Sequence, residues 1–228
     1  MPLFICQAVL FDLDGVLVDS TPCVTRVWTA WALQYRLDPD YVVHVAHGQK
    51  AIETLRKVAP QLDAVSEMAK VEQMELDDTD GLRVLPGARE LLAALPAERY
   101  SIVTSGTRRL ATKRLQVVGL PVPPNMVTAD DVARGKPDPE PYLAGAAAVG
   151  IAAGECLVFE DAPSGIRSAK AAGAQVVAVS TTYKPEELTD SREIIPSLAS
   201  VRTLGVDDRG QLRLEVVDGW AGACPQTI

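Results

Sequence analysis

Residues 7–20, Gln-Ala-Val-Leu-Phe-Asp-Leu-Asp-Gly-Val-Leu-Val-Asp-Ser, carry the strongest structural signal in the chain. Ala8 to Phe11 form a short apolar run that suits a strand buried on both faces, and the run ends in Asp12. Asp14 comes two residues later, and Gly15 allows the backbone to turn tightly. The two carboxylates can converge on one site, although the same pattern also fits a strand that ends in a solvated acidic turn. Matching groups elsewhere in the chain decide between these interpretations.

The chain is acidic: its 228 residues carry 30 Asp and Glu against 22 Lys and Arg, a net charge of −8. With no Lys/Arg-rich stretch, this balance argues against nucleic acid as the partner. An anionic substrate would therefore need local positive charge from a metal ion or a placed lysine. The four cysteines lack C-x-x-C spacing, which predicts free thiols in a reducing compartment. With no signal peptide and no apolar run of membrane-spanning length in the sequence, we expect a cytoplasmic monomer that acts away from membranes.

Two regions differ in their patterns. Residues 20–83 contain helical patterns and no convincing strand, which predicts an all-helical block of three or four helices. Beyond it, strand-like apolar runs alternate with helical patterns, so a Rossmann-like parallel sheet with helices on both faces is expected. We therefore expect an α/β core of residues 1–19 and 84–228 with an inserted helical cap of residues 20–83. The strands after the cap are expected at 100–103, 126–127, 156–159 and 175–179, and the helices at 88–95, 108–118 and 140–149.

The last part of the chain predicts a β-hairpin. Apolar and polar residues alternate over 212–217, and Asp207-Asp208-Arg209-Gly210 is typical of a turn. A hairpin over about 201–217 is expected to cover an edge of the parallel sheet.

Ligands of a parallel sheet bind beyond the carboxyl ends of its strands, so the residues just after each strand are the candidates for a site. Thr104-Ser105-Gly106-Thr107 offers hydroxyls and backbone amides that can hold phosphate oxygens. Lys136 lies between Gly135 and Pro137, which favours a positioned charge over a mobile surface one. Glu160 and Asp161 come directly after the strand at 156–159. Carboxylates gathered at one sheet edge repel one another unless a hard cation lies among them, and Mg²⁺ is the usual choice for such oxygen ligands.

This set of residues resembles the haloacid dehalogenase-like hydrolase superfamily, whose four motifs correspond to Asp12-x-Asp14, Ser105 (or Thr104), Lys136 and Glu160-Asp161. The resemblance implies that Asp12 is a nucleophile that forms an aspartyl-phosphate and that Asp14 is the general acid and base. It implies phosphate binding by Ser105, Gly106 and Lys136. It also implies that Mg²⁺ is held by Asp12, the Asp14 backbone carbonyl and Asp161, with Glu160 as a further ligand or as a partner of a metal-bound water.

Within that superfamily, four segments of this chain, 44–48 in the cap and 104–108, 135–143 and 159–166 in the core, are similar to the glycerol-3-phosphate phosphatase and 2-deoxyglucose-6-phosphate phosphatase group, which often has Arg in place of Lys50. His47 and Lys50, around Gly48, are the cap residues expected to contact the substrate, either on one helical face or across a turn. For His44, the sequence leaves both a structural and a functional role open. The resemblance implies Mg²⁺-dependent hydrolysis of a small polyol or sugar phosphate monoester. The alternative is a phosphohexomutase of the β-phosphoglucomutase type, which shares the core and the kind of cap.

Overall fold

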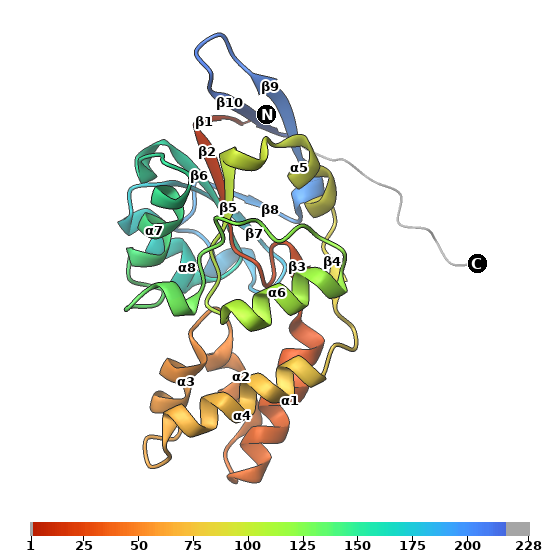
Figure 1. The fold of residues 1–228 in the computed structure, drawn as a ribbon, viewed down its shortest axis with the longest axis vertical. Coiled ribbons are helices and arrows are strands. Elements are labelled where there is room, and N and C mark those ends of the chain that lie inside the picture. The colour runs from red at the N-terminus through yellow and green to blue at the C-terminus, as the bar shows by residue number, and fades with distance from the viewer. Residues whose placement is uncertain (1, 218–228) are drawn as a thin grey trace, which may run out of the picture.

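The computed structural model describes residues 2–217, and Figure 1 shows their elements in chain order. A parallel sheet lies in the middle of the molecule, four helices form one end, and an antiparallel hairpin forms the other (Figure 1). Within the described range, no helix combines the length and the apolar character that crossing a bilayer requires. Cys6, Cys23 and Cys156 are buried free thiols, and Cys224 lies outside the described residues.

The central sheet has five parallel strands in the order β5-β2-β6-β7-β8. Its central strands are almost wholly apolar and buried on both faces, as strands of a covered parallel sheet are. The predicted strand at 126–127 is reduced to one isolated bridge between Val103 and Val127. Pro123 and Pro124 precede it and lack the N–H donors that would lengthen the pairing. The strands are β2 (Ala8–Phe11), β5 (Tyr100–Ile102), β6 (Cys156–Glu160), β7 (Gln175–Val179) and β8 (Glu193–Ile195).

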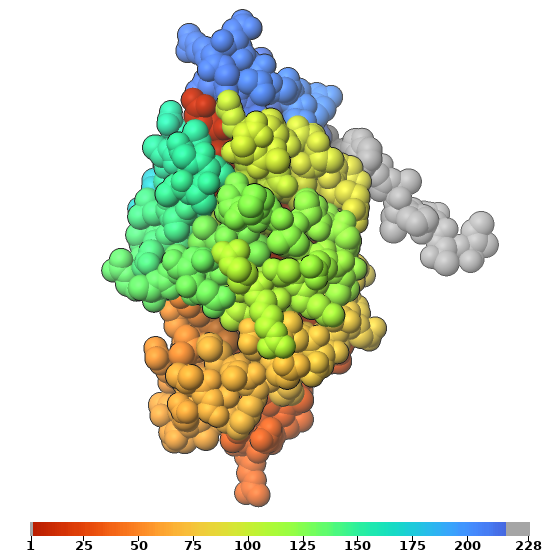
Figure 2. All heavy atoms as spheres, viewed as in Figure 1, coloured from red at the N-terminus to blue at the C-terminus, as the bar shows by residue number. Residues whose placement is uncertain are grey.

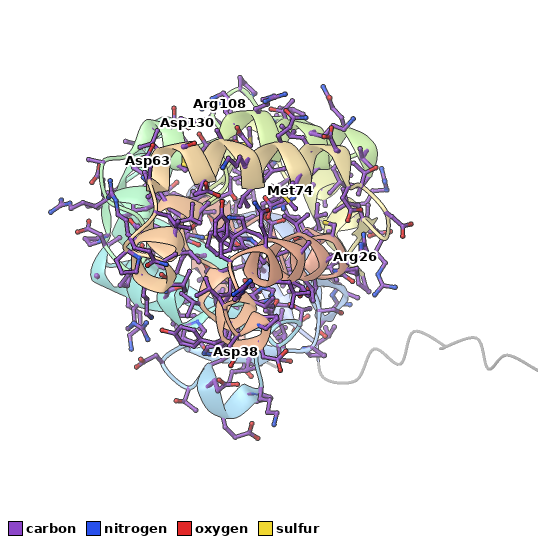
Figure 3. The ribbon with its side chains drawn as sticks, turned by 90° about the horizontal axis from the view of Figure 1, so that it is seen from below. Arg26, Asp38, Asp63, Met74, Arg108 and Asp130 are labelled. Carbon is purple, nitrogen blue, oxygen red and sulfur yellow. The ribbon has the colours of Figure 1, made fainter. Side chains whose placement is uncertain are left out.

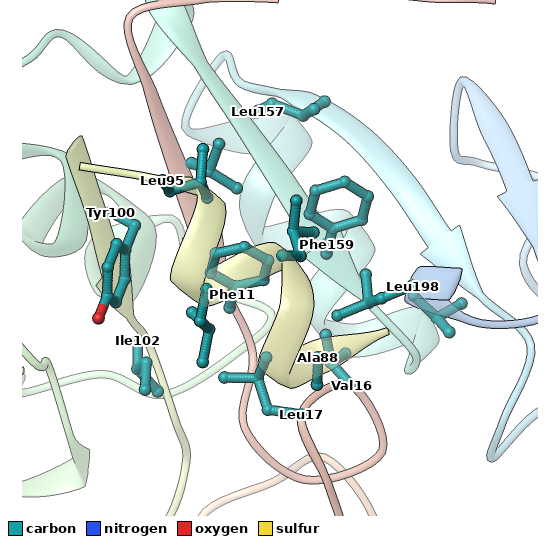
Figure 4. Packing of buried hydrophobic residues seen from close by; sticks show 14 of the residues in the cluster. Phe11, Val16, Leu17, Ala88, Leu95, Tyr100, Ile102, Leu157, Phe159 and Leu198 are labelled. Carbon is teal, nitrogen blue, oxygen red and sulfur yellow. The ribbon is translucent and has the colours of Figure 1, made fainter. Parts of the chain in front are cut away.

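Helices cover both faces of this sheet, and alternate residues of each strand point to opposite faces. Val9 and Phe11 of β2 join the hydrophobic cluster that includes α5 (Ala88–Ala94) and α6 (Arg108–Val117). Ala8 and Leu10 join the second cluster, with α7 (Glu140–Ala148) and α8 (Pro163–Ala171). Figure 4 shows the first cluster, in which the Phe11 and Phe159 rings stack with their centroids 5.5 Å apart. Burying such a side chain contributes about 1.5–3 kcal/mol, so the two clusters hold the strand ends in place.

The C-terminal hairpin consists of β9 (Val201–Val206) and β10 (Leu212–Val216), which confirms the predicted hairpin. It does not pair with an edge of the parallel sheet. Its strand β10 pairs antiparallel with β1 (Leu3–Cys6), and β1, β10 and β9 form a separate three-stranded sheet. The reason lies in the alternation of β10, whose buried residues Leu212 and Leu214 pack into the first hydrophobic cluster.

Four helices lie between the short strands β3 (Val18–Asp19) and β4 (Arg83–Val84), which pair antiparallel so that the chain leaves and returns side by side. Their shared core includes Trp28, Trp31 and Leu55. The Trp31 indole N–H donates to Glu67 at 3.0 Å, which satisfies the ring's polar group. In Figure 2 these helices occupy the orange end of the molecule, and Figure 3 looks onto that end. They are α1 (Thr21–Gln34), α2 (Pro39–Ala46), α3 (Ala51–Val58) and α4 (Ala64–Asp77).

Candidate active site

The carboxyl ends of β2 and β6 and the loop before α7 bring Asp12, Lys136 and Glu160 together. The Lys136 ammonium donates to Asp12 Oδ1 and to Glu160 Oε1, each at 2.7 Å, and to the Val103 carbonyl at 3.1 Å. The lysine is almost fully buried, so it is the positioned charge that its place between glycine and proline predicts. All three of its protons are used, which fixes the ammonium in one orientation.

Glu160 is held by more than the lysine. The Tyr142 hydroxyl of α7 donates to Glu160 Oε1 at 3.0 Å, and the Ala162 backbone N–H donates to Oε2 at 2.8 Å. Both carboxylate oxygens of Glu160 therefore accept hydrogen bonds from protein donors. Sequence reasoning did not identify Tyr142. A tyrosine in the first turn of a helix offers no signal for this role before the helix is packed against the sheet.

The cluster carries excess negative charge. Carboxylate oxygens of Asp12, Glu160 and Asp161 lie within 4.8 Å of one another, all buried. Burial raises the pKa of Asp12 from 3.8 to about 7, with Glu160 and Asp14 adding to the rise and Lys136 opposing it. Burial and the neighbouring Glu160 and Asp12 also raise the pKa of Asp161. Three buried acids share one ammonium, so the oxygen donors and the uncompensated charge fit a divalent cation such as Mg²⁺.

Asp14 faces a different set of groups. The Ser20 hydroxyl donates to Asp14 Oδ1 at 2.6 Å, and Arg114 of α6 donates to Asp14 Oδ2 at 2.7 Å. Arg114 also lies 3.4 Å from Glu75 of α4, so its guanidinium joins the four-helix end to the α/β part. Sequence reasoning missed Arg114. The available signal was its position beside the buried residues Leu110, Ala111 and Leu115 of an otherwise amphipathic helix.

The predicted phosphate-binding segment lies directly after β5. Thr104 Oγ1 accepts the Gly106 N–H at 3.1 Å, whereas the Ser105 hydroxyl donates to the Gly48 carbonyl at 3.3 Å. Both hydroxyl residues and Gly106 line the same cavity as Asp12. Ser105 therefore lies where the sheet end meets the turn between α2 and α3.

That turn separates the two predicted cap residues. His47 ends α2, Lys50 precedes α3, and Gly48 between them has a φ of 73°, so the residues flank a turn instead of sharing a helical face. A Cβ on Gly48 would lie 2.8 Å from the Ala162 Cβ, so only glycine permits this approach to the sheet end. Both His47 and Lys50 line the cavity.

Lys50 and the two histidines have different surroundings. The Lys50 ammonium donates to the carbonyls of Ala129 and Val132 at 3.0 and 2.7 Å, across to the α/β part. Burial lowers the pKa of His47, with His44 adding and Asp14 opposing. His44 is exposed, and its ring meets the Tyr183 ring edge-on at 6.3 Å between centroids.

The cavity that these groups share has a volume of about 300 Å³. Its walls come from the strand ends on one side and from α1, α4 and the turn between α2 and α3 on the other. Of the residues predicted for the site, the cavity brings together Asp12, Asp14, Ser105, Gly106, His47, Lys50 and Asp161. Lys136 and Glu160 lie behind Asp12, joined to it through the lysine.

One family model and several known proteins match this chain. The model of the "Haloacid dehalogenase-like hydrolase" family matches residues 9–179. The chain is 41% identical to "Hexitol phosphatase A" of Escherichia coli (strain K12), over 86% of this chain and 93% of that protein. It is 36% identical to "Glycerol-1-phosphate phosphohydrolase 1" of Saccharomyces cerevisiae, over 78% of this chain and 76% of that protein.

Among solved structures, a hydrolase from Pseudomonas syringae is similar to this chain with a TM-score of 0.77 and 27% identity. The match covers 85% of this chain and 94% of that one. The sequence and structural matches agree, and the chain belongs to the haloacid dehalogenase-like hydrolase family.

Proposed function

We propose that this protein is a Mg²⁺-dependent phosphatase that hydrolyses a small polyol or sugar phosphate monoester through an aspartyl-phosphate. The observation that carries the proposal is the grouping of Asp12, Lys136 and the Glu160-Asp161 pair at one edge of the parallel sheet, beside the cavity. The relatives named hexitol phosphatase and glycerol-1-phosphate phosphohydrolase support the substrate class.

Asp12 is the nucleophile in this mechanism. One of its oxygens attacks phosphorus, the bond from phosphorus to the ester oxygen breaks, and the phosphoryl group passes to the carboxylate. The Lys136 ammonium at 2.7 Å keeps the carboxylate in place and favours its ionised form against the cost of burial. Burial works against the ionised form of Asp12 and the lysine favours it, so the lysine matters to the nucleophile as much as to the phosphate.

Asp14 is the general acid and base. It protonates the departing alkoxide and then takes a proton from the water that hydrolyses the aspartyl-phosphate. Ser20 and Arg114 hold the two oxygens of this carboxylate, so its orientation is set by contacts from the start of α1 and from α6. These contacts direct Asp14 toward the cavity it shares with Asp12.

The remaining groups position the phosphoryl oxygens. Ser105 and Gly106 line the cavity with Asp12, and their hydroxyl and backbone N–H would exchange their partners, the Gly48 carbonyl and Thr104 Oγ1, for phosphoryl oxygens, while Lys136 supplies positive charge. Mg²⁺ would be held by Asp12, Asp161 and the Asp14 carbonyl, with Glu160 as a further ligand or partner of a bound water. When bound, the ion offsets the negative charge of the phosphate and of the carboxylates.

Residues 20–83 would act as a cap over a core of residues 1–19 and 84–228. The paired strands β3 and β4 are the two crossings between these parts, which makes them the expected hinge. His47 and Lys50 would contact the substrate from the cap, and the Lys50 bonds to Ala129 and Val132 would hold the closed arrangement. The enzyme would be a cytoplasmic monomer, in keeping with its buried free thiols Cys6, Cys23 and Cys156.

A phosphatase screen tests the proposal. Inorganic phosphate release is measured from glycerol, deoxy-sugar, hexitol and hexose phosphates, with excess Mg²⁺ and with EDTA. We expect Mg²⁺-dependent release that Asp12→Asn abolishes, while the exposed substitution Asp208→Asn retains it. Full activity of Asp12→Asn would refute the mechanism. Conversion of one hexose phosphate into another in the presence of a bisphosphate, without net phosphate release, would instead identify a mutase.

A further inference from the structure

The cavity has two halves, and only one of them meets the phosphate. In the proposed mechanism the phosphoryl group lies beside Asp12 and Ser105, so the rest of the substrate extends toward the four-helix end. That half is lined by residues of α1 and α4. Apolar side chains there include Val24, Trp28 and Met68, which suit the carbon skeleton of a substrate.

Two carboxylates are among the polar groups of this second half, with Thr21 of α1. They are Glu72 and Glu75 of α4. Glu72 is half-buried and accepts a hydrogen bond from the Thr107 hydroxyl, whereas Glu75 is buried beside Arg114. A carboxylate only accepts hydrogen bonds, and each of these retains acceptor capacity beyond its protein partner.

The cations around this half already have partners. Arg114, with 6% of its side chain exposed, is shared between Asp14 and Glu75. Lys50 donates to two backbone carbonyls, and the His47 imidazole has a lowered pKa because it is buried. Lys136 is paired with Asp12 and Glu160 behind the nucleophile. Among the cavity-lining cations of residues 2–217, Lys50 has no carboxylate partner, and its two hydrogen bonds hold its ammonium against the Ala129 and Val132 carbonyls of the α/β part.

This arrangement favours substrates whose tail carries hydroxyl groups over substrates whose tail carries a second anionic group. Hydroxyl groups can donate to the free acceptor positions of Glu72 and Glu75, and charged acceptors make the stronger hydrogen bonds. A second phosphate or a carboxylate would lose its water and face the acidic side chains of α4, beside which Arg114 is already shared between Asp14 and Glu75, and this is unfavourable. The difference applies to the tail alone, because the first phosphate has Lys136 and a metal ion beside it.

We propose that Glu72 and Glu75 make this cavity selective for phosphate monoesters with a neutral polyhydroxylated tail and exclude those with a second anionic group. This inference rests on the proposed phosphatase activity and specifies the substrate class of the same cavity. It also separates the enzyme from mutases, which must bind a sugar bisphosphate.

Matched substrate pairs test the proposal. Glucitol 6-phosphate and gluconate 6-phosphate differ at C1, where a CH₂OH group replaces a carboxylate, and glycerol 3-phosphate and 3-phosphoglycerate differ in the same way. We expect kcat/KM for each polyol phosphate to exceed that of its carboxylate partner by at least about tenfold, which corresponds to about 1.4 kcal/mol. Glucose 1,6-bisphosphate should be hydrolysed at least as poorly as the carboxylates.

Two variants that each remove one negative charge test whether Glu72 and Glu75 cause the selectivity. Glu72→Gln and Glu75→Gln should each reduce the polyol-to-carboxylate ratio at least about threefold, mainly by raising kcat/KM for the carboxylate. Asp77→Asn on the same helix α4 is the control, because Asp77 is exposed and contacts Gln73 outside the cavity. Glu72 is only half-buried, so Glu72→Gln keeps the test valid if Glu75→Gln disturbs the fold through Arg114.

The outcomes are distinct. Equal kcat/KM for both members of each pair in the unmodified enzyme would overturn the inference and leave the phosphatase function standing. A polyol-to-carboxylate ratio of kcat/KM that neither variant changes would do the same. No hydrolysis of any phosphomonoester would overturn the proposed function, and the inference with it. A ratio that falls in both variants and stays constant in Asp77→Asn supports the proposal.

Discussion

Replacing Asp12 by asparagine should abolish phosphate release and also stabilise the metal-free protein against heat. Asp12 is buried among like charges, which raises its pKa from 3.8 to about 7. The folded protein therefore binds the Asp12 proton more tightly than the unfolded chain does. As pH rises from about 4 to 7, the unfolded chain releases this proton first, and stability is lost across that window. Asparagine does not titrate, so its variant escapes this loss.

The size of the effect comes from the pKa. Each unit of pKa difference corresponds to about 1.4 kcal/mol, and Asp12 is buried enough that solvent screening is small. Between pH 5 and pH 7.5, the wild-type protein should lose about 2.5 kcal/mol of stability that the Asp12→Asn variant keeps. For a protein of this size, that corresponds to a Tm difference that widens by roughly 5 to 10 °C. The change with pH is more informative than the absolute difference, because the substitution also removes the ion pair with Lys136.

The assay is thermal unfolding by circular dichroism in EDTA at a series of pH values from 5 to 7.5. Asp208→Asn, in the exposed turn between β9 and β10, is the control, and its Tm should track that of the wild type at every pH. A Tm difference between Asp12→Asn and wild type that is constant or becomes smaller as pH rises would refute the electrostatic account of the cluster.

The same contacts support three more predictions. Lys136→Met should inactivate the enzyme and lower its free energy of unfolding by about 3–5 kcal/mol, measured in urea, because buried carboxylates lose their cation; unchanged stability would contradict this. Excess Mg²⁺ should raise the Tm more at pH 7.5 than at pH 5, since the ligands must be ionised, and Asp161→Asn should diminish the rise. Equal rises at both pH values would argue against a carboxylate site. Gly48→Ala should reduce kcat/KM, because the added Cβ at 2.8 Å from Ala162 Cβ pushes the turn away from the sheet end, and it should also lower the Tm, because alanine rarely adopts the φ of 73° at this position; wild-type kinetics would show that this approach is not needed.

Much of the fold could be predicted from local patterns. Buried parallel strands read as short apolar runs, as in Ala8–Phe11 and Cys156–Glu160, and helices with apolar stripes lie between them. The short strands β3, β4 and β8 escaped prediction, because two or three residues carry no periodicity. The sequence also did not indicate which strands pair with each other. The hairpin was expected at an edge of the parallel sheet, but β10 pairs with β1 from the opposite end of the chain.

The amino-acid sequence alone is enough to name the residues that gather at the sheet edge. Parallel strands place their carboxyl ends on one side, so Asp12, Lys136 and Asp161 converge once the strand order is known. The surroundings of these residues depend instead on how the elements pack. Arg114 meets Asp14 across 100 positions of sequence, and Lys50 reaches the Ala129 carbonyl across 79. Such contacts are set by the packing of α6 beside the segment that follows β2 and by the place where the turn at Gly48 docks, and no local pattern in the chain encodes that packing.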